Sequence, residues 1–85
     1  MTDHHTVHVR VNSPDKVIWE GDAQWVSSVN REGPFDILPF HSNFISIIEK
    51  KPVKVKLTGG EVREFSFDHS VIYAHANQVY IYTNI

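Results

Sequence analysis

Apolar and polar residues alternate in several short segments of the chain. Between Thr6 and Val11, three valines lie on one face of an extended chain, while His8 and Arg10 lie on the other. A period of two is typical of a β-strand that is buried on one side only. The same alternation recurs at residues 53–57, and more loosely at residues 62–67. These segments are predicted to be half-buried strands.

Turn-forming residues separate further strand-sized segments. Asn12–Asp15 predicts a turn, and residues 16–20 then begin a strand that a bulge or bend at Gly21-Asp22 continues into residues 23–29. Two glycines in Thr58–Glu61 predict a hairpin. A second hairpin is expected where residues 71–74 and 79–82 flank a polar turn.

Two segments have a less regular pattern. Residues 31–44, REGPFDILPFHSNF, contain Pro34 and Pro39, neither of which can lie in the middle of a sheet. We interpret this segment as a rigid surface loop anchored by its own apolar residues, a place where binding residues tend to lie. Phe44–Ile48 fits either one helical turn or a strand.

Seven or more short strands without a convincing helix predict an all-β fold, and we favour a small two-sheet antiparallel β-sandwich over a small barrel. One domain is expected at residues 6–85, after a disordered N-terminus at residues 1–5. The predicted core consists of Val7, Val9, Val11, Ile18, Val26, Ile37, Ile47, Val53, Val55, Phe65, Phe67, Ile72, Val79 and Ile81.

The composition narrows the possible functions. A chain of 85 residues with 41% hydrophobic residues can build one small core. A net charge of -2 provides no strong field for nucleic acid or an anionic membrane. No cysteine is present, which excludes disulfides, thiolate metal sites and a cysteine nucleophile. No secretion signal or apolar membrane-spanning run appears, so we expect a soluble compartment and no membrane insertion.

The histidines do not form a recognisable metal site. His4 and His8 would share one face of an extended chain about 13 Å apart, too far for one ion. His41, His69 and His75 lie in predicted loops and have no carboxylate at a ligand spacing. Neither a metal nor a cofactor is therefore expected.

Catalytic motifs are also missing. Asp36, His41 and Ser42 could supply an aspartate, a histidine and a serine, but no nucleophile elbow surrounds the serine. Gly59-Gly60 does not belong to a phosphate-binding loop, because no lysine follows at the spacing that such a loop requires. The chain could also be an oligonucleotide-binding barrel that binds single-stranded nucleic acid, but its overall acidity disfavours this function.

Trp25 precedes Val26, and only one of the two can face the core, so Trp25 is expected at a partner surface or half-covered by the fold.

Several motifs together resemble a known family. They are Ser13-Pro14, the run VIWEGDA at residues 17–23, Glu32-Gly33, and the run ILP followed by His41. In this order they resemble the N-terminal domain of the epsilon subunit of F-type ATP synthases. That family typically has S-P-x-x-x-(I/V)-(F/Y)-x-G-x-A and then E-G-x-x-G-I-L-P-G-H-x-P. The resemblance covers about residues 7–82, although Asp36 and Phe40 replace two of the family's glycines.

The resemblance implies a non-catalytic subunit of the rotor's central stalk. Such a subunit joins the gamma subunit to the ring of c subunits, so that torque passes between ion flow and ATP synthesis. It would be a peripheral subunit on the cytoplasmic side of the inner (plasma) membrane. The chain stops at Ile85, before the family's C-terminal helical hairpin, so we expect neither autoinhibition nor ATP binding. The alternative is a free-standing sandwich that binds another protein or a carbohydrate.

The resemblance also implies contact residues. The segment that matches Glu32–His41 would approach the c-ring, and surface aromatic residues would bind gamma, because aromatic residues are enriched in binding hot spots. The residues expected at partner contacts are Glu32, Pro34, Phe35, Phe40, His41, Trp25, Tyr73, Tyr80 and Tyr82.

Overall fold

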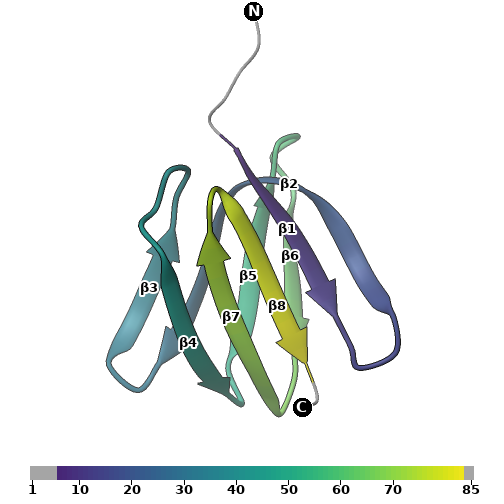
Figure 1. The fold of residues 1–85 in the computed structure, drawn as a ribbon, viewed down its shortest axis with the longest axis vertical. Coiled ribbons are helices and arrows are strands. Elements are labelled where there is room, and N and C mark those ends of the chain that lie inside the picture. Colours follow the sequence, from purple (N-terminus) through teal and green to yellow (C-terminus); the bar gives the residue numbers. More distant parts are fainter. Residues whose placement is uncertain (1–5, 84–85) are drawn as a thin grey trace, which may run out of the picture.

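The computed structural model describes residues 6–83, which form eight β-strands and no helix (Figure 1). The expected disordered residues 1–5 lie outside this range. Within it, no helix long and apolar enough to cross a membrane is found. The strands are β1 (Val7–Asn12), β2 (Val17–Asn30), β3 (Gly33–Ile37), β4 (Phe44–Glu49), β5 (Pro52–Leu57), β6 (Val62–Ser66), β7 (His69–His75) and β8 (Gln78–Thr83).

One hydrogen-bonded sheet folds over itself into two layers. Its strand order is β4-β7-β8-β1-β2-β5-β6, and β3 pairs with β2 beside this path. In Figure 1 the layer of β4, β7, β8 and β1 lies in front of β2, β5 and β6. The 14-residue strand β2 joins the layers, because its first half pairs with β1 and its second half with β3 and β5. The predicted all-β sandwich is confirmed, and β1 and β8 are its one parallel pair among the described strands.

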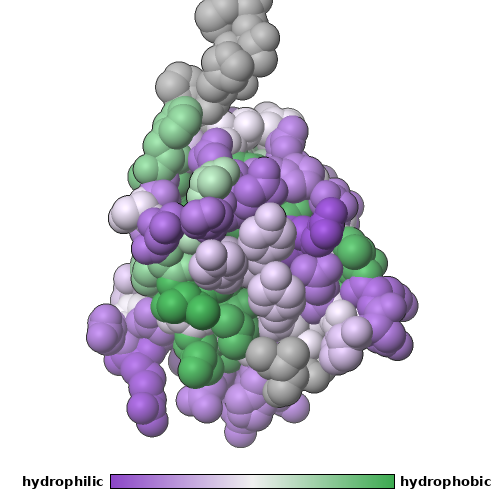
Figure 2. Space-filling view, in the orientation of Figure 1, coloured by the Kyte–Doolittle hydropathy of each residue, from purple (hydrophilic) through white to green (hydrophobic). Residues whose placement is uncertain are grey.

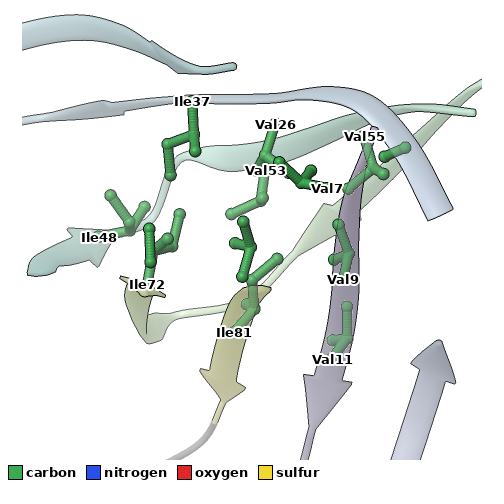
Figure 3. Close-up of a cluster of buried hydrophobic side chains, with 13 residues drawn as sticks. Val7, Val9, Val11, Val26, Ile37, Ile48, Val53, Val55, Ile72 and Ile81 are labelled. Carbon is green, nitrogen blue, oxygen red and sulfur yellow. The ribbon is translucent and has the colours of Figure 1, made fainter. Parts of the chain in front are cut away.

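The core lies between the two layers, where side chains from both meet (Figure 3). Most of the predicted core is confirmed, and Phe65 and Phe67 pack against it half-buried. Ile18 and Ile47 were predicted wrongly, since their side chains are 40% and 64% exposed. The buried apolar residues are Val7, Val9, Val11, Ala23, Val26, Ile37, Ile48, Val53, Val55, Ile72, Ala74, Val79 and Ile81.

The error at Ile18 follows from an irregular register between β1 and β2. Val11 lies opposite Trp19 and Asn12 lies opposite Val17, so Ile18 is left without a partner of its own. Trp19 instead packs against the core, with its ring centroid 6.0 Å from that of Phe65.

The sequence predicted a bulge or bend at Gly21-Asp22, but β2 pairs with β1 in continuous register through these two residues. Its irregularity in the pairing with β5 lies between Ala23 and Trp25. Gly21 has a different role, because a Cβ atom there would lie 2.8 Å from Cζ2 of Trp19. The indole ring therefore occupies the space that a larger residue would need.

The segment 31–44 is only partly a loop, which corrects the prediction. Gly33–Ile37 forms β3, where Pro34 lies opposite Val29 on a strand that pairs only with β2. An edge strand tolerates the missing N–H of proline. Gly33, with a φ of 120°, follows a tight turn in which the Asn30 side-chain oxygen accepts a hydrogen bond from the Glu32 amide at 2.9 Å. The irregular connection is limited to residues 38–43, and Phe44–Ile48 belongs to a strand.

Candidate protein–protein interface

The loop of residues 38–43 presents apolar side chains to solvent at one end of the sandwich, the upper end in Figure 1. Leu38 is 51% exposed and Phe40 is 70% exposed. The His41 amide donates a hydrogen bond to the Leu38 carbonyl at 3.1 Å, which closes a turn with Pro39 and Phe40 at its centre. Phe40 has a φ of 64°, in the left-handed region that glycine normally occupies.

The side chain of Asn77 ties this loop to two other segments. Its oxygen accepts a hydrogen bond from the Phe40 amide at 2.8 Å, and its NH₂ group donates to the Thr6 carbonyl at 2.7 Å. The backbone carbonyl of Asn77 also accepts from the His8 amide at 3.1 Å. One residue of the β7–β8 turn therefore fixes both the loop tip and the start of β1.

Aromatic rings support the loop from behind. The His41 ring meets the Phe44 ring edge-on, with 5.7 Å between centroids, and its Nδ1 donates to the Ser42 carbonyl at 2.7 Å. Phe44 in turn packs on Phe35, with centroids 5.1 Å apart. Phe35 is half-buried against the core. Its ring therefore supports the loop, and only part of it faces solvent.

A second apolar surface covers the outside of β4, β7 and β8. We call it the outer face, and it consists of Ile45, Ile47, Val71, Tyr73, Tyr80 and Tyr82. Across the strands, Ile45 lies opposite Tyr73, which lies opposite Tyr80. In the next row, Ile47 lies opposite Val71, which lies opposite Tyr82. Figure 2 shows the hydrophobic part of this surface over β4 and β7.

The two isoleucines of the outer face are unusually exposed, since isoleucine is among the residues most often buried. Ile45 and Ile47 are 68% and 64% exposed. The tyrosines beside them form a stack, with 6.1 Å between the centroids of Tyr73 and Tyr80 and 6.3 Å between those of Tyr80 and Tyr82. A contiguous apolar patch on a folded domain marks a binding surface, whereas single exposed apolar residues do not.

An open groove of about 540 Å³ extends the outer face toward the β2–β3 turn. Arg31 and Glu32 provide polar side chains along it, and Ile45, Ile47 and Val71 provide apolar ones. The amide group of Asn30 donates to the Ser46 hydroxyl at 2.9 Å, which fixes the turn to β4. The groove is therefore lined by both apolar and charged residues, as protein interfaces are.

The structure distributes the predicted contact residues over several places. Glu32, Tyr73, Tyr80 and Tyr82 lie on or beside the outer face, and Phe40 and His41 lie in the loop. Pro34 is exposed on the edge strand β3, and Trp25 lies half-buried on β2 opposite Lys56, in the other layer. Sequence reasoning missed Ile45, Ile47 and Asn77. The role of each as a partner contact stays a prediction.

A charged cluster lies on the exposed side of β1 and β2. His8 contacts two carboxylates, through Nε2 to Glu20 at 2.6 Å and through Nδ1 to Asp22 at 2.9 Å. Arg10 donates to the same Glu20 oxygen at 3.3 Å. Hydrogen bonds to Glu20 and then to Asp22 raise the pKa of His8 above 6.5. Hydrogen bonds from His8 and Arg10 lower the pKa of Glu20 below 4.5.

The cluster predicts a dependence of stability on pH. Because folding raises the pKa of His8, its contribution is complete below about pH 6.5 and is lost as the pH rises through the raised value. We expect the urea midpoint of unfolding to decrease slightly between pH 6 and pH 9. The corresponding loss in the free energy of unfolding should be below about 1 kcal/mol, because the cluster is exposed. The His8→Gln variant should show a flatter profile. An equal decrease in the variant would assign the effect to other groups.

Within residues 6–83, no group of three or more His, Cys, Asp and Glu side chains could hold a metal ion. The groove beside β4 is open to solvent, which suits contact with a protein surface better than enclosure of a small substrate. The fold and this surface define a small β-sandwich with an exposed apolar face.

Comparison with known proteins identifies the family. Residues 6–85 match the family model described as the ATP synthase Delta/Epsilon chain, beta-sandwich domain. The chain belongs to this family. It is 36% identical over 63 residues to the ATP synthase epsilon chain of Janthinobacterium sp., covering 74% of this chain and 45% of that protein. It is 26% identical over 76 residues to that of Clostridium novyi, covering 89% and 58%.

Solved structures share the fold. A chain of the Euglena gracilis mitochondrial ATP synthase, from a structure of OSCP, F1 and the c-ring, superposes with a TM-score of 0.83 at 14% identity, covering 98% of this chain and 52% of that one. A chain of the Tetrahymena thermophila mitochondrial ATP synthase, from its central stalk and c-ring, gives a TM-score of 0.75 at 17% identity, covering 92% and 63%. The chain spans about half the length of the curated relatives it matches.

Proposed function

We propose that this domain is a non-catalytic part of the central stalk of an F-type ATP synthase. It would join the gamma shaft to the c-ring during ion-driven ATP synthesis, as a peripheral component on the cytoplasmic side of the membrane. The family assignment supports this role. So do the solved structures with the same fold, one from an assembly of OSCP, F1 and the c-ring and the other from a central stalk and c-ring.

The observation that carries the proposal is the outer face. Ile45 and Ile47 would lose most of their exposed area against a partner, and the tyrosines beside them are of the residue class that dominates binding hot spots. We assign gamma to this face. We assign the c-ring to the loop of residues 38–43, which lies at the end of the sandwich and is fixed by Asn77.

Rigidity of both surfaces suits a contact that transmits torque. The outer face is built on three hydrogen-bonded strands, and the loop tip is bonded to the β7–β8 turn. A mobile contact would deform under load and dissipate the strain. The outer face is instead part of the folded sheet, and the loop is hydrogen-bonded to the turn between two of its strands.

Reconstitution with purified partners tests the proposal. We expect the 85-residue chain to co-elute with the cognate gamma subunit in size-exclusion chromatography. Tyr82→Ala should weaken this binding about tenfold or more, since it truncates a partly exposed aromatic residue of the outer face. Val62→Ala, at a 45%-exposed residue of β6 in the other layer, is the matched control and should bind normally. Absence of binding by the unmodified chain would contradict the proposal.

A further inference from the structure

Phe40 combines two unfavourable properties. Its backbone is in the left-handed region. A non-glycine residue disfavours this conformation relative to ordinary backbone conformations by a factor on the order of a few-fold to a hundredfold. Its ring is 70% exposed, the highest value among the large hydrophobic residues described, so little burial compensates for that cost. Backbone strain of this kind persists where surrounding structure imposes it, and it tends to occur at functional sites.

Hydrogen bonds hold the backbone of Phe40 in its left-handed conformation. The Phe40 amide is bonded to the Asn77 side chain at 2.8 Å, and the neighbouring His41 amide is bonded to the Leu38 carbonyl at 3.1 Å. Asn77 is itself held in place, because its NH₂ group is bonded to Thr6 at 2.7 Å. The contact between Phe40 and Asn77 joins residues 37 positions apart, so it belongs to the tertiary structure and not to the loop alone.

We propose that Phe40 is a pre-organised binding anchor and that Asn77 is the positioning residue that holds it. This inference rests on the proposed function, in which the loop meets the c-ring. Leu38 and Phe40 are the exposed apolar residues of the loop, and the exposed Ser42 and Asn43 follow them. The surface of the ring that receives the loop should therefore contain an apolar recess that accepts an aromatic ring. A tip fixed in advance loses little conformational entropy on binding.

Two substitutions of Phe40 separate the ring from the backbone strain. Phe40→Gly removes both, and we expect it to lower the unfolding equilibrium constant about threefold to tenfold. Phe40→Ala removes the ring and keeps the strain, so it should give no such stabilisation. Both should weaken binding to a purified assembly of the cognate gamma subunit and c-ring at least tenfold, as measured by biolayer interferometry.

Substitutions of Asn77 test its positioning role. Asn77→Gly tolerates the φ of 62° and loses both side-chain hydrogen bonds. We expect hydrogen exchange of the Phe40 amide to become at least tenfold faster, and binding to weaken. Asn77→Asp keeps the acceptor for the Phe40 amide but loses the donor to the Thr6 carbonyl, so that amide should exchange at a rate between those of the unmodified chain and Asn77→Gly. Phe40→Gly should no longer stabilise the domain in the Asn77→Gly background, because the freed loop can relax without it.

The outcomes distinguish this inference from the proposed function. Equal binding by the unmodified chain and Phe40→Ala would overturn the anchor role and leave the proposed function standing. Unchanged exchange of the Phe40 amide in Asn77→Gly would overturn the positioning role. Absence of any binding by the unmodified chain to the gamma–c-ring assembly would contradict both the proposed function and the anchor role.

Discussion

Replacing Ile48 with alanine is expected to lower the free energy of unfolding by about 2–5 kcal/mol. Ile48 is 0% exposed and extends from β4 into the core, where Figure 3 shows it near Ile72 and Ile37. A domain of this size has a total stability of about 4–13 kcal/mol, on the basis of roughly 0.05–0.15 kcal/mol per residue. The loss would thus be a large share of the whole. Urea denaturation followed by tryptophan fluorescence measures it.

The neighbouring residue is the matched control. Ile47→Ala makes the same chemical change one position earlier on the same strand, but at a side chain that is 64% exposed. We expect it to change the free energy of unfolding by less than about 0.5 kcal/mol. Similar losses for Ile47→Ala and Ile48→Ala would contradict the orientation of β4 in which Ile48 faces the core and Ile47 faces solvent.

Replacing Ile47 with lysine is expected to have the largest effect on binding. Under the proposed function, this substitution places a charge on the outer face, where Ile47 lines the groove together with Ile45. The affinity for the gamma subunit should decrease about 30-fold or more, which corresponds to about 2 kcal/mol. Stability should be unaffected, because a lysine on an exposed edge strand is readily solvated. Titration calorimetry with purified gamma measures the affinity.

An isoleucine elsewhere provides the control for this charge. Ile18 is 40% exposed on β2, which is separated from β4 in the sheet by β7, β8 and β1. Ile18→Lys introduces the same charge outside the outer face and should bind gamma normally. If both lysine variants bound as tightly as the unmodified chain, gamma would have to contact another surface.

Regular alternation made much of the fold predictable. The three valines of β1 and the lysine-separated strand β5 each bury one face, so their period of two identified strand and core together. The strand β4 lacked this signal, because Ile45, Ile47 and Ile48 are apolar on both of its faces. The period of a continuous apolar run is not defined, and Ile47 was therefore assigned to the core in place of Ile48. Pro34 concealed β3 because proline is accepted only at a sheet edge, and the edge is a tertiary property.

The candidate contact surfaces were less predictable than the fold. The aromatic residues Tyr73, Tyr80 and Tyr82 were selected by residue type, but their grouping with Ile45 and Ile47 depends on strand order, which alternation does not reveal. The hydrogen bond from Phe40 to Asn77 crosses 37 residues of sequence, and no local pattern predicts it. A signal for the strain was present, since Phe40 stands where the resembling family has glycine.

The parallel pairing of β1 with β8 has a consequence for the order in which this domain is made. These strands are neighbours in the middle of the sheet, although their paired residues, such as His8 and Gln78, stand about 70 positions apart. Of the described strands, the ribosome releases β1 well before β8, so β1 has one edge unpaired until β8 emerges. We expect the nascent chain to reach its two-layered fold only after Thr83 has left the exit tunnel, and chaperones that shield exposed strands to act before that point.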